Sequence, residues 1–254
     1  MAKKATNPAI EYITLPVAHV QAIQTARFPF TKGKHTCFDS FNLGLHVGDN
    51  EASVVANRKI LQKSLPKSSQ IQWLEQVHSN DVLIIDSIIT PFPKADAIIT
   101  RTPNLALAIM TADCLPILLT NKKGDEIAAL HCGWRSTVNN IIDNTLAKME
   151  SEPQDIIAWL GPCICQQHFE VGGEVKAAFI EQSPKLARYF IQNSSLQYQA
   201  DLSGIAQELL KLSGVNCIID SKECTYVESE KYYSYRRENI TGRMASVICI
   251  NKLR

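Results

Sequence analysis

Residues 105–136 read LALAIMTADCLPILLTNKKGDEIAALHCGWRS, and this stretch decides the fold. Two apolar runs, PILLT and EIAAL, flank the turn-forming residues NKKGD at 121–125. This pattern predicts a β-hairpin, because strands are short and such residues connect them. Cys114 precedes the first strand and His131 follows the second. The hairpin would therefore bring a thiol and an imidazole to one end of a sheet.

Strand-like and helix-like segments alternate along the rest of the chain. Strands are predicted within residues 11–28, 71–86, 95–100, 156–161, 215–220 and 245–251. Helices are predicted over 51–65, capped by Asp49 or Asn50, over 136–150, capped by Ser136, and over 172–183 and 202–214, with Gly214 as the C-terminal stop. Residues 31–50, rich in Gly, Asn and Asp, predict an ordered functional loop. The alternation indicates an α/β (α+β) sandwich, with a mixed sheet and flanking helices, in one domain over residues 1–254.

The composition is that of an ordinary globular protein, with 45% hydrophobic and 20% charged residues. A formal net charge of +1 gives no electrostatic reason to expect nucleic acid or an anionic membrane as a partner. The sequence has no apolar run of signal-peptide or bilayer-spanning length, so a cytoplasmic location is expected. Its eight cysteines, several of them in apolar runs, are expected to be reduced thiols rather than a disulfide frame.

His78 has a context similar to that of His131, because each follows an apolar run and precedes small or polar residues. If the strands end on one side of a sheet, His78, Cys114 and His131 converge. Two imidazoles and one thiolate form a catalytic zinc set with a fourth position open. The alternative from spacing alone is equally good: Cys114 and Cys132 as buried small apolar residues and the histidines as hydrogen-bonded polar ones.

A set of motifs resembles the YfiH/YlmD family, also labelled laccase-like or multicopper polyphenol oxidase and including FAMIN-like domains. The motifs are NLGLHVGDN (42–50), QVHS (76–79), TADCLP (111–116), HCGWRS (131–136), GPCI (161–164), FEVGGEV (169–175) and SYRRENITGRMAS (234–246). The resemblance runs from about residue 35 to the C-terminus. It implies a zinc ion held by His78, Cys114 and His131. It also implies phosphorolysis of adenosine, inosine and methylthioadenosine, and deamination of adenosine to inosine.

The loop before NLG departs from the family pattern. It reads KGKHTCFDSF where a Gly-Gly-Val-Ser-like start is usual, which leaves the substrate contacts of that loop open.

The histidine count tests the older label. A multicopper oxidase needs many imidazoles, usually in His-x-His pairs, and this chain has six histidines and no such pair. A four-copper mechanism is excluded, while one Cu²⁺ at a Cys-His-His site remains an alternative to zinc. Two further alternatives are a metal-free hydrolase or deamidase, in which His131 activates Cys114, and a zinc-stabilised binding module, which would want a fourth ligand.

Other residues are candidates for substrate contacts. Phosphate as a substrate needs cationic donors, and Arg135, Arg236, Arg237 and Arg243 are candidates, with surface ion pairing as the alternative for each. Asp113 is a candidate proton shuttle beside Cys114, although alternation along a strand would turn it to the other face. Asn42 is a candidate contact to ribose or base, or else a turn former.

Purine nucleosides and phosphate are the expected partners, and no obligate protein partner is indicated. The run Cys163-x-Cys165 with His168 suggests a second metal site. It is a weaker candidate than the first, because no fourth ligand stands nearby. Tyr232, Tyr233 and Tyr235 suggest base stacking or core packing.

Overall fold

The computed structural model describes residues 7–27 and 37–251, and their strands form three sheets. The first sheet has the order β1-β2-β14-β6-β3, with bounds Ile10–Ile13, Val20–Thr25, Met244–Ile250, Leu105–Thr111 and Gln70–Gln72. The second has the order β13-β9-β7-β8-β5-β4, with bounds Cys217–Asp220, Ile156–Leu160, Leu115–Asn121, Ile127–Cys132, Ala97–Thr100 and Val82–Ile84. A small third sheet has the order β10-β12-β11, with bounds Glu170–Val171, Tyr198–Ala200 and Phe190–Gln192.

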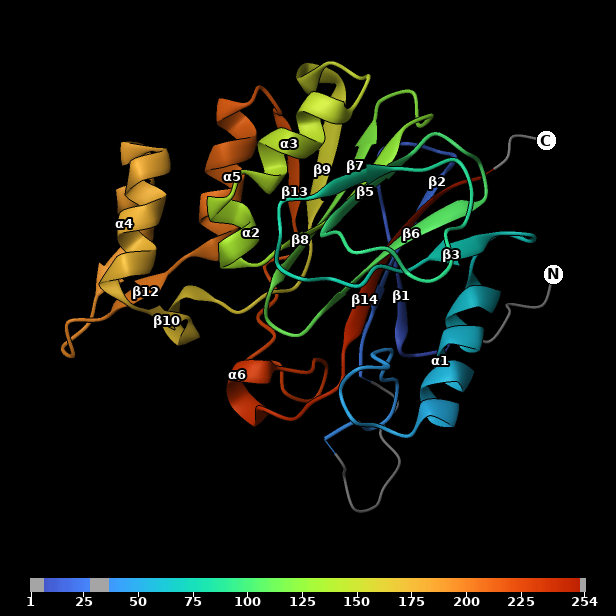
Figure 1. The fold of residues 1–254 in the computed structure, drawn as a ribbon, viewed down its shortest axis with the longest axis horizontal. Helices are drawn as coiled ribbons and strands as arrows, with labels where there is room; N and C mark the ends of the chain where they lie inside the picture. The colour runs from blue at the N-terminus through green and yellow to red at the C-terminus, as the bar shows by residue number, and fades with distance from the viewer. Residues whose placement is uncertain (1–6, 28–36, 252–254) are drawn as a thin grey trace.

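Helices cover both outer faces of the two large sheets (Figure 1). The α-helices are α1 (Glu51–Ser64), α2 (Trp134–Val138), α3 (Ile141–Lys148), α4 (Gly173–Gln182), α5 (Leu202–Leu212) and α6 (Tyr235–Glu238). The described residues also form three 3-10 turns: η1 (Pro153–Asp155), η2 (Gln166–His168) and η3 (Pro184–Tyr189). In the described part of the chain, no helix combines the length and the hydropathy that crossing a bilayer requires.

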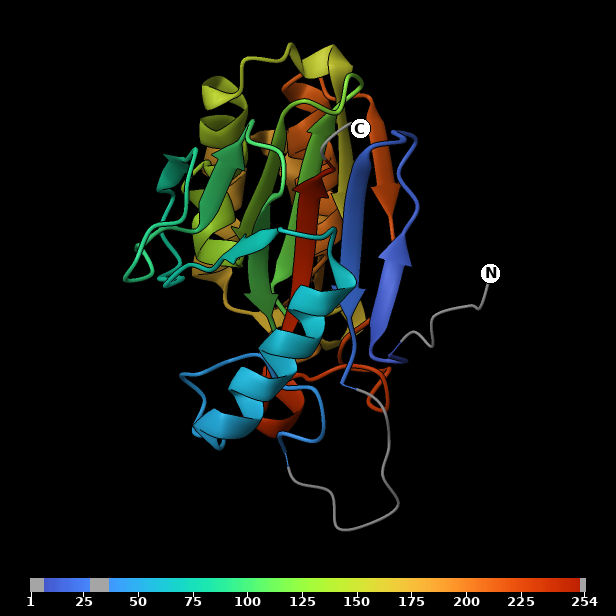
Figure 2. The same ribbon diagram turned by 90° about the vertical axis from the view of Figure 1, so that its right-hand side faces the viewer.

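Alternation along the strands explains why the two large sheets stack. In β6, Leu107 and Ile109 pack into the cluster between the sheets, whereas Ala106 and Ala108 face the side covered by α1. In the second sheet, Leu118 of β7 faces the first sheet, and its neighbours along the strand face the cluster beneath α3 and α5. Figure 2 shows α1 lying across the outer face of the first sheet. The predicted sandwich of mixed strands with flanking helices is confirmed, as four layers with two large sheets inside.

The predicted hairpin is present as β7 and β8. They pair antiparallel, with Leu115 opposite Cys132 and Leu118 opposite Ala129. Gly124 in the connecting turn has a φ of 71°, a conformation that glycine adopts without strain. The central strands of the sandwich are therefore those that the opening stretch of sequence predicts.

The segment from 136 to 150 differs from the single helix predicted for it. Asn140 has a φ of 64°, and this left-handed residue separates α2 from α3. Gly133 is the residue before α2, so Ser136 lies inside a helix rather than at its cap. The prediction failed because the apolar spacing continues across the break. By contrast, Asn50 does cap α1, accepting a hydrogen bond from the Ser53 N–H, and Gly214 follows α5 with a φ of 93°.

The chain crosses between the two large sheets at two points that matter for the site. It leaves β3 of the first sheet for β4 of the second through a segment that contains His78. It leaves β6 of the first sheet for β7 of the second through Asp113 and Cys114. His78 has a φ of 60° and Asp113 a φ of 93°, so each crossing turns on a left-handed residue. Such residues are uncommon and often mark functional positions.

Candidate metal centre and its cavity

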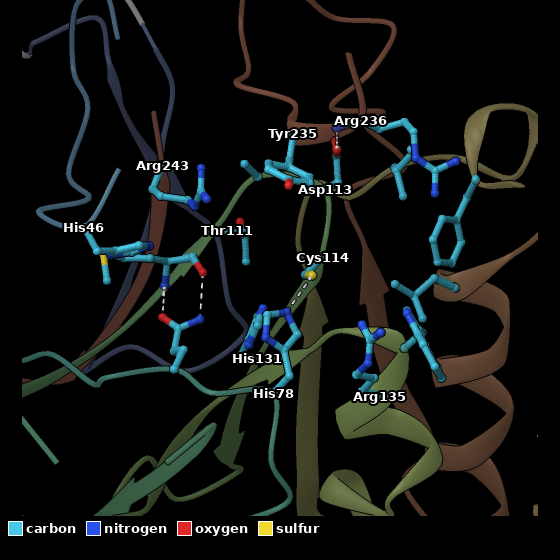
Figure 3. Close-up of a pocket in the computed structure, with 17 residues that line it drawn as sticks. His46, His78, Thr111, Asp113, Cys114, His131, Arg135, Tyr235, Arg236 and Arg243 are labelled. Carbon is cyan, nitrogen blue, oxygen red and sulfur yellow. Dashed lines mark hydrogen bonds between the residues drawn. The ribbon is translucent and has the colours of Figure 1, made fainter. Parts of the chain in front are cut away.

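Three side chains with metal-binding atoms meet at this end of the sandwich: His78, Cys114 and His131 (Figure 3). Their ligand atoms lie within 4.8 Å of one another, and no other group of three or more such residues occurs within 7–27 and 37–251. Sγ of Cys114 is 3.8 Å from Nε2 of His78, and the two imidazole centroids are 4.7 Å apart. The structure thus brings together all three of the ligands expected from the sequence.

Different elements supply the three side chains. His78 and Cys114 lie on the two crossings between sheets, while His131 is the penultimate residue of β8. His131 has the same strand parity as Ala129, which faces the first sheet, so its ring turns into the space between the sheets. Cys132, the next residue, packs in the core on the opposite face. The alternation of one strand therefore separates a site residue from a core thiol.

Asp96, which was not predicted from the sequence, holds two of the three candidate ligands, His78 and His131, in place. The side chain is fully buried. One carboxylate oxygen accepts a hydrogen bond from Nδ1 of His131 at 2.7 Å. The other accepts from the N–H groups of Val77 and Ser79, on either side of His78, at 3.1 and 2.7 Å. Because Asp96 occupies Nδ1, Nε2 of His131 is left for a ligand, the arrangement typical of metal-bound histidines.

The charges of Cys114 and His131 strongly shift each other's pKa. Burial raises the pKa of the Cys114 thiol, but the imidazoles of His131 and His78 outweigh this and lower it to about 6. Burial lowers the pKa of His131, but the Cys114 thiolate and Asp96 raise it to about 9. Burial raises the pKa of Cys132 well above the usual range, so this neighbouring thiol stays neutral. Of the two adjacent thiols, only Cys114 is prepared to be a thiolate ligand or nucleophile.

The donor set suits one metal ion. Two ligands bound tetrahedrally to zinc at the usual Zn–S and Zn–N distances lie about 3.6 Å apart, close to the 3.8 Å between Cys114 Sγ and His78 Nε2. Two nitrogens and one sulfur fit zinc or copper. The three ligands open onto a cavity, so a fourth position is available to water or substrate. The group can hold one metal ion, whose identity the ligands alone leave open.

The cavity has a volume of about 570 Å³, within the range usual for small-molecule sites. An apolar part of its lining consists of Trp134, Ile164, Phe169 and Leu202. His46 and Arg243 lie together on one side of the ligand cluster, and Arg135 lies on the other (Figure 3). The cavity therefore combines an apolar wall with cationic groups beside the ligands.

The four candidate arginines differ in what remains free to bind a ligand. Arg135 lines the cavity, stacks on Trp134 at 4.4 Å and makes no ion pair within the described residues. Arg243 lines it as well, and its Nη1 donates to the carbonyls of Thr241 and Gly242.

The other two are more heavily engaged. Arg236 reaches the rim while donating to the carbonyls of His168 and Glu170. Arg237 does not line the cavity: its guanidinium donates to three backbone carbonyls and pairs with Glu238. Phosphate binding by Arg237 is therefore disfavoured, because its donors are already used.

Asn42 is also turned away from the cavity. Its side chain is fully buried; Oδ1 accepts from the N–H groups of Gly44 and Arg243, and Nδ2 donates to Asp49. These hydrogen bonds favour the turn-forming role of Asn42 over the contact to substrate. The residue of the same loop that reaches the cavity is His46. Residues 31–36 of that predicted loop lie outside the described residues.

Asp113 lines the cavity, but its carboxylate is fully engaged. It accepts hydrogen bonds from the hydroxyls of Thr225 and Ser234 at 2.6 and 3.0 Å and from the N–H of Arg236 at 2.7 Å. The expectation that strand alternation would turn Asp113 away is wrong, because the residue lies in the crossing before β7 and not in a strand. These contacts favour a positioning role over proton transfer.

Several cavity residues were not anticipated, among them His46 and Phe169. His46 stands in the NLGLHVG motif, but nothing in the sequence separates it from a solvent-exposed histidine. Its pKa is lowered by burial and by the nearby charges of Arg243 and Arg58. Phe169 follows the Cys-x-Cys run and supplies part of the apolar wall. Of the three tyrosines, Tyr232 and Tyr233 are buried in the core and only Tyr235 lines the cavity.

A sandwich of two mixed sheets with a His–Cys–His group at one end is the class of protein that the fold and the site define. The chain belongs to the YfiH/YlmD family. Residues 28–251 match the family model described as multi-copper polyphenol oxidoreductase laccase.

Named relatives cover most of the chain. "Purine nucleoside phosphorylase YfiH" of Escherichia coli K12 is 44% identical over 211 residues, which cover 83% of this chain and 86% of the relative. "Purine nucleoside phosphorylase" of Haemophilus influenzae is 40% identical over 216 residues, covering 82% and 86%.

Solved structures agree with the fold. Neisseria meningitidis protein NMB0706 superposes with a TM-score of 0.90 at 36% identity, covering 96% of this chain and all of that one. YlmD from Geobacillus stearothermophilus gives a TM-score of 0.86 at 27% identity, covering 99% and 98%.

Proposed function

We propose that the protein is a zinc-dependent purine nucleoside phosphorylase. Adenosine, inosine and methylthioadenosine would be its substrates, and deamination of adenosine to inosine a second reaction of the same site. The observation that carries the proposal is the meeting of His78, Cys114 and His131 at a cavity that also holds cationic groups. The name of the Escherichia coli relative, which is 44% identical, supports the phosphorolytic reaction. When bound, zinc would supply a Lewis acid that activates water or polarises a substrate oxygen.

The two parts of the cavity suit the two parts of the reaction. A purine is flat and apolar on its faces, so Trp134, Phe169 and Leu202 are the groups we assign to the base. Phosphate needs charged donors, which Arg243 and Arg135 supply. Since the pKa of His46 is lowered by burial and by its arginine neighbours, this imidazole is neutral near pH 7 and can share a hydrogen bond with the ribose or phosphate. The chain's own part in catalysis would be to hold both substrates in contact.

Metal content and inosine turnover, measured together, test the ligand assignment. In protein loaded with zinc, we expect phosphate-dependent release of hypoxanthine. Cys114→Ala should lose both the metal and the turnover, whereas Cys217→Ala, on the edge strand β13, should keep both. Full turnover by a metal-free Cys114→Ala protein would refute the mechanism.

Two further assays test the phosphate and deamination parts separately. Arg243→Gln should raise the KM for phosphate at least tenfold with little change in the KM for inosine, because it removes one charged donor. An equal rise in both would argue against a phosphate-specific contact. Conversion of adenosine to inosine in phosphate-free buffer tests deamination, and its absence from fully zinc-loaded protein would remove that activity alone.

A metal-free alternative is favoured by the proximity of Cys114 and His131, whose charges lower the pKa of the thiol and raise that of the imidazole. Such a thiolate–imidazolium pair is the arrangement of cysteine hydrolases and deamidases. Chelation followed by zinc addition separates the two functions: activity that disappears and returns with zinc supports the phosphorylase. Activity that survives chelation supports the hydrolase. Oxygen consumption that tracks copper content would instead support a single-copper phenol oxidase.

A further inference from the structure

The Cys163-x-Cys165 run does not form the metal site that its spacing suggested. Cys163 is buried, and the ring of His168 stacks on Tyr226 with centroids 4.2 Å apart. In the described ranges, these residues form no group of three ligands, the one such group being at the candidate metal centre. Instead, Cys165 meets a cysteine far away in sequence. Its Sγ lies 2.7 Å from Sγ of Cys224.

The backbone holds the two thiols together. Cys163 and Cys224 form a parallel β-bridge, and the N–H of Cys165 donates to Sγ of Cys224 at 3.2 Å. Both Cys165 and Cys224 are partly exposed, unlike Cys132, Cys163 and Cys249, so small oxidants reach them. A disulfide would need the sulfur atoms to approach by about 0.7 Å, since the S–S bond is about 2.05 Å long. Small side-chain rotations supply that movement.

We propose that Cys165 and Cys224 form a reversible disulfide that fastens one wall of the cavity. The oxidant would be a low-molecular-weight disulfide such as glutathione disulfide. One protein thiolate attacks it, forming a mixed disulfide and releasing one small thiol; the second protein thiolate then displaces the other. Two protein thiols are thereby oxidised and one small disulfide is reduced to two thiols. Burial and the neighbouring Cys224 raise the pKa of Cys165.

The pair is connected to the candidate site through Asp113. Ile164, next to Cys165, lines the cavity and donates its N–H to the Asp113 carbonyl at 3.0 Å. Thr225, next to Cys224, donates its hydroxyl to the Asp113 carboxylate and its N–H to the Cys163 carbonyl. A disulfide would join covalently the two segments that hold Asp113, the residue before Cys114. The disulfide would fasten this wall whatever substrate the cavity binds.

Redox titration of the zinc-loaded protein with mixtures of glutathione disulfide and glutathione tests the proposal. Peptide mapping should find a Cys165–Cys224 cross-link, with two fewer free thiols per chain. Hydrogen exchange should slow at least fivefold at the amides of Ile164 and Thr225. Cys217→Ser should behave like the wild type, whereas Cys165→Ser and Cys224→Ser should show neither change.

Two serine variants are used so that the test still holds if one of them fails to fold. Serine is chosen because it keeps a hydrogen-bond acceptor at either position. Glutathione left on Cys165 or Cys224 without a cross-link would overturn the proposal. So would thiols that stay reduced in glutathione disulfide alone, or a cross-link that leaves both amides exchanging at the reduced rate. Inosine turnover is measured separately, so failure of the phosphorylase assignment leaves these readouts intact.

Discussion

The Asp96 carboxylate joins two of the three candidate ligands. One of its oxygens lies 2.7 Å from Nδ1 of His131, while the other accepts from the N–H groups on either side of His78. The carbonyl of Asp96 also accepts from the His131 N–H at 2.7 Å. The single residue Asp96, just before β5, thus orients a side chain on β8 and a backbone turn between the sheets.

Asp96→Asn is expected to weaken metal binding by about 10–100-fold, the usual cost of removing a residue that orients a ligand. The variant keeps the size of the side chain but removes a negative charge beside His131. Competition with a chromogenic chelator measures the affinity. Asp86→Asn, on an exposed segment, is the matched control. Unchanged affinity in Asp96→Asn would show that the backbone alone orients the two histidines.

Gly133→Ala is expected to displace the ligands directly. A Cβ at this position would lie 2.9 Å from Cδ2 of His78 and 3.1 Å from Sγ of Cys114, both too close for an unmoved neighbour. We expect metal occupancy and turnover to fall at least tenfold with far-UV circular dichroism unchanged. Gly173→Ala should be silent, because its Cβ would meet only one atom, 3.9 Å away. A fully metallated, active Gly133→Ala protein would argue against a metal at these three residues.

Cys114 in metal-free protein should react with iodoacetamide from an unusually low pH. Although burial raises its pKa, the two imidazoles lower it to about 6. The thiolate fraction, and with it the rate, should rise tenfold per pH unit below 6 and level off above it. An ordinary thiol levels off only above about pH 8.5. His131→Gln should move the midpoint upward, and zinc should suppress the reaction. A midpoint near 8.5 in the wild type would contradict this account.

Asp113→Asn separates positioning from proton transfer. Asparagine tolerates the left-handed backbone, but its NH₂ group would face donors where the carboxylate accepts three hydrogen bonds. We expect a loss of about 1–3 kcal/mol in the free energy of unfolding, measured by denaturant titration. Asp143→Asn, in an exposed pair with Ser213, should lose far less. A normal stability together with a lost acidic limb in the pH profile of kcat would instead identify a proton shuttle.

Local patterns predict the hairpin because the physics that forms it is local. Apolar runs of strand length and a glycine-containing turn lie within a few residues of one another, so the sequence predicts that Cys114 and His131 lie close together. The approach of His78 is less local, since it depends on where β3 and β4 lie. From the residues alone, this ligand set is one of two equal interpretations, and the resemblance to a family favours it.

Asp96 shows what the sequence does not reveal. Nothing in ADAIIT distinguishes this carboxylate from one on a solvent-exposed turn, and its partner His131 is reached only through the pairing of β5 with β8. The same limit explains Asn42 and Arg237. Both stand in motifs that surround the cavity, but sequence position does not tell that their polar atoms are already used by the backbone.

Because of the two crossings, the geometry of the candidate site depends on how the two large sheets are stacked. His78 and Cys114 lie where the chain leaves the first sheet for the second, and His131 belongs to the second alone. The spacing of the ligands therefore follows any sliding of one sheet over the other. Substitutions in the apolar layer between the sheets, such as at Ile109 or Leu118, are therefore expected to change the distances among the three candidate ligands. In this fold, a change in the packing between the two sheets is therefore also a change in the geometry of the candidate metal site.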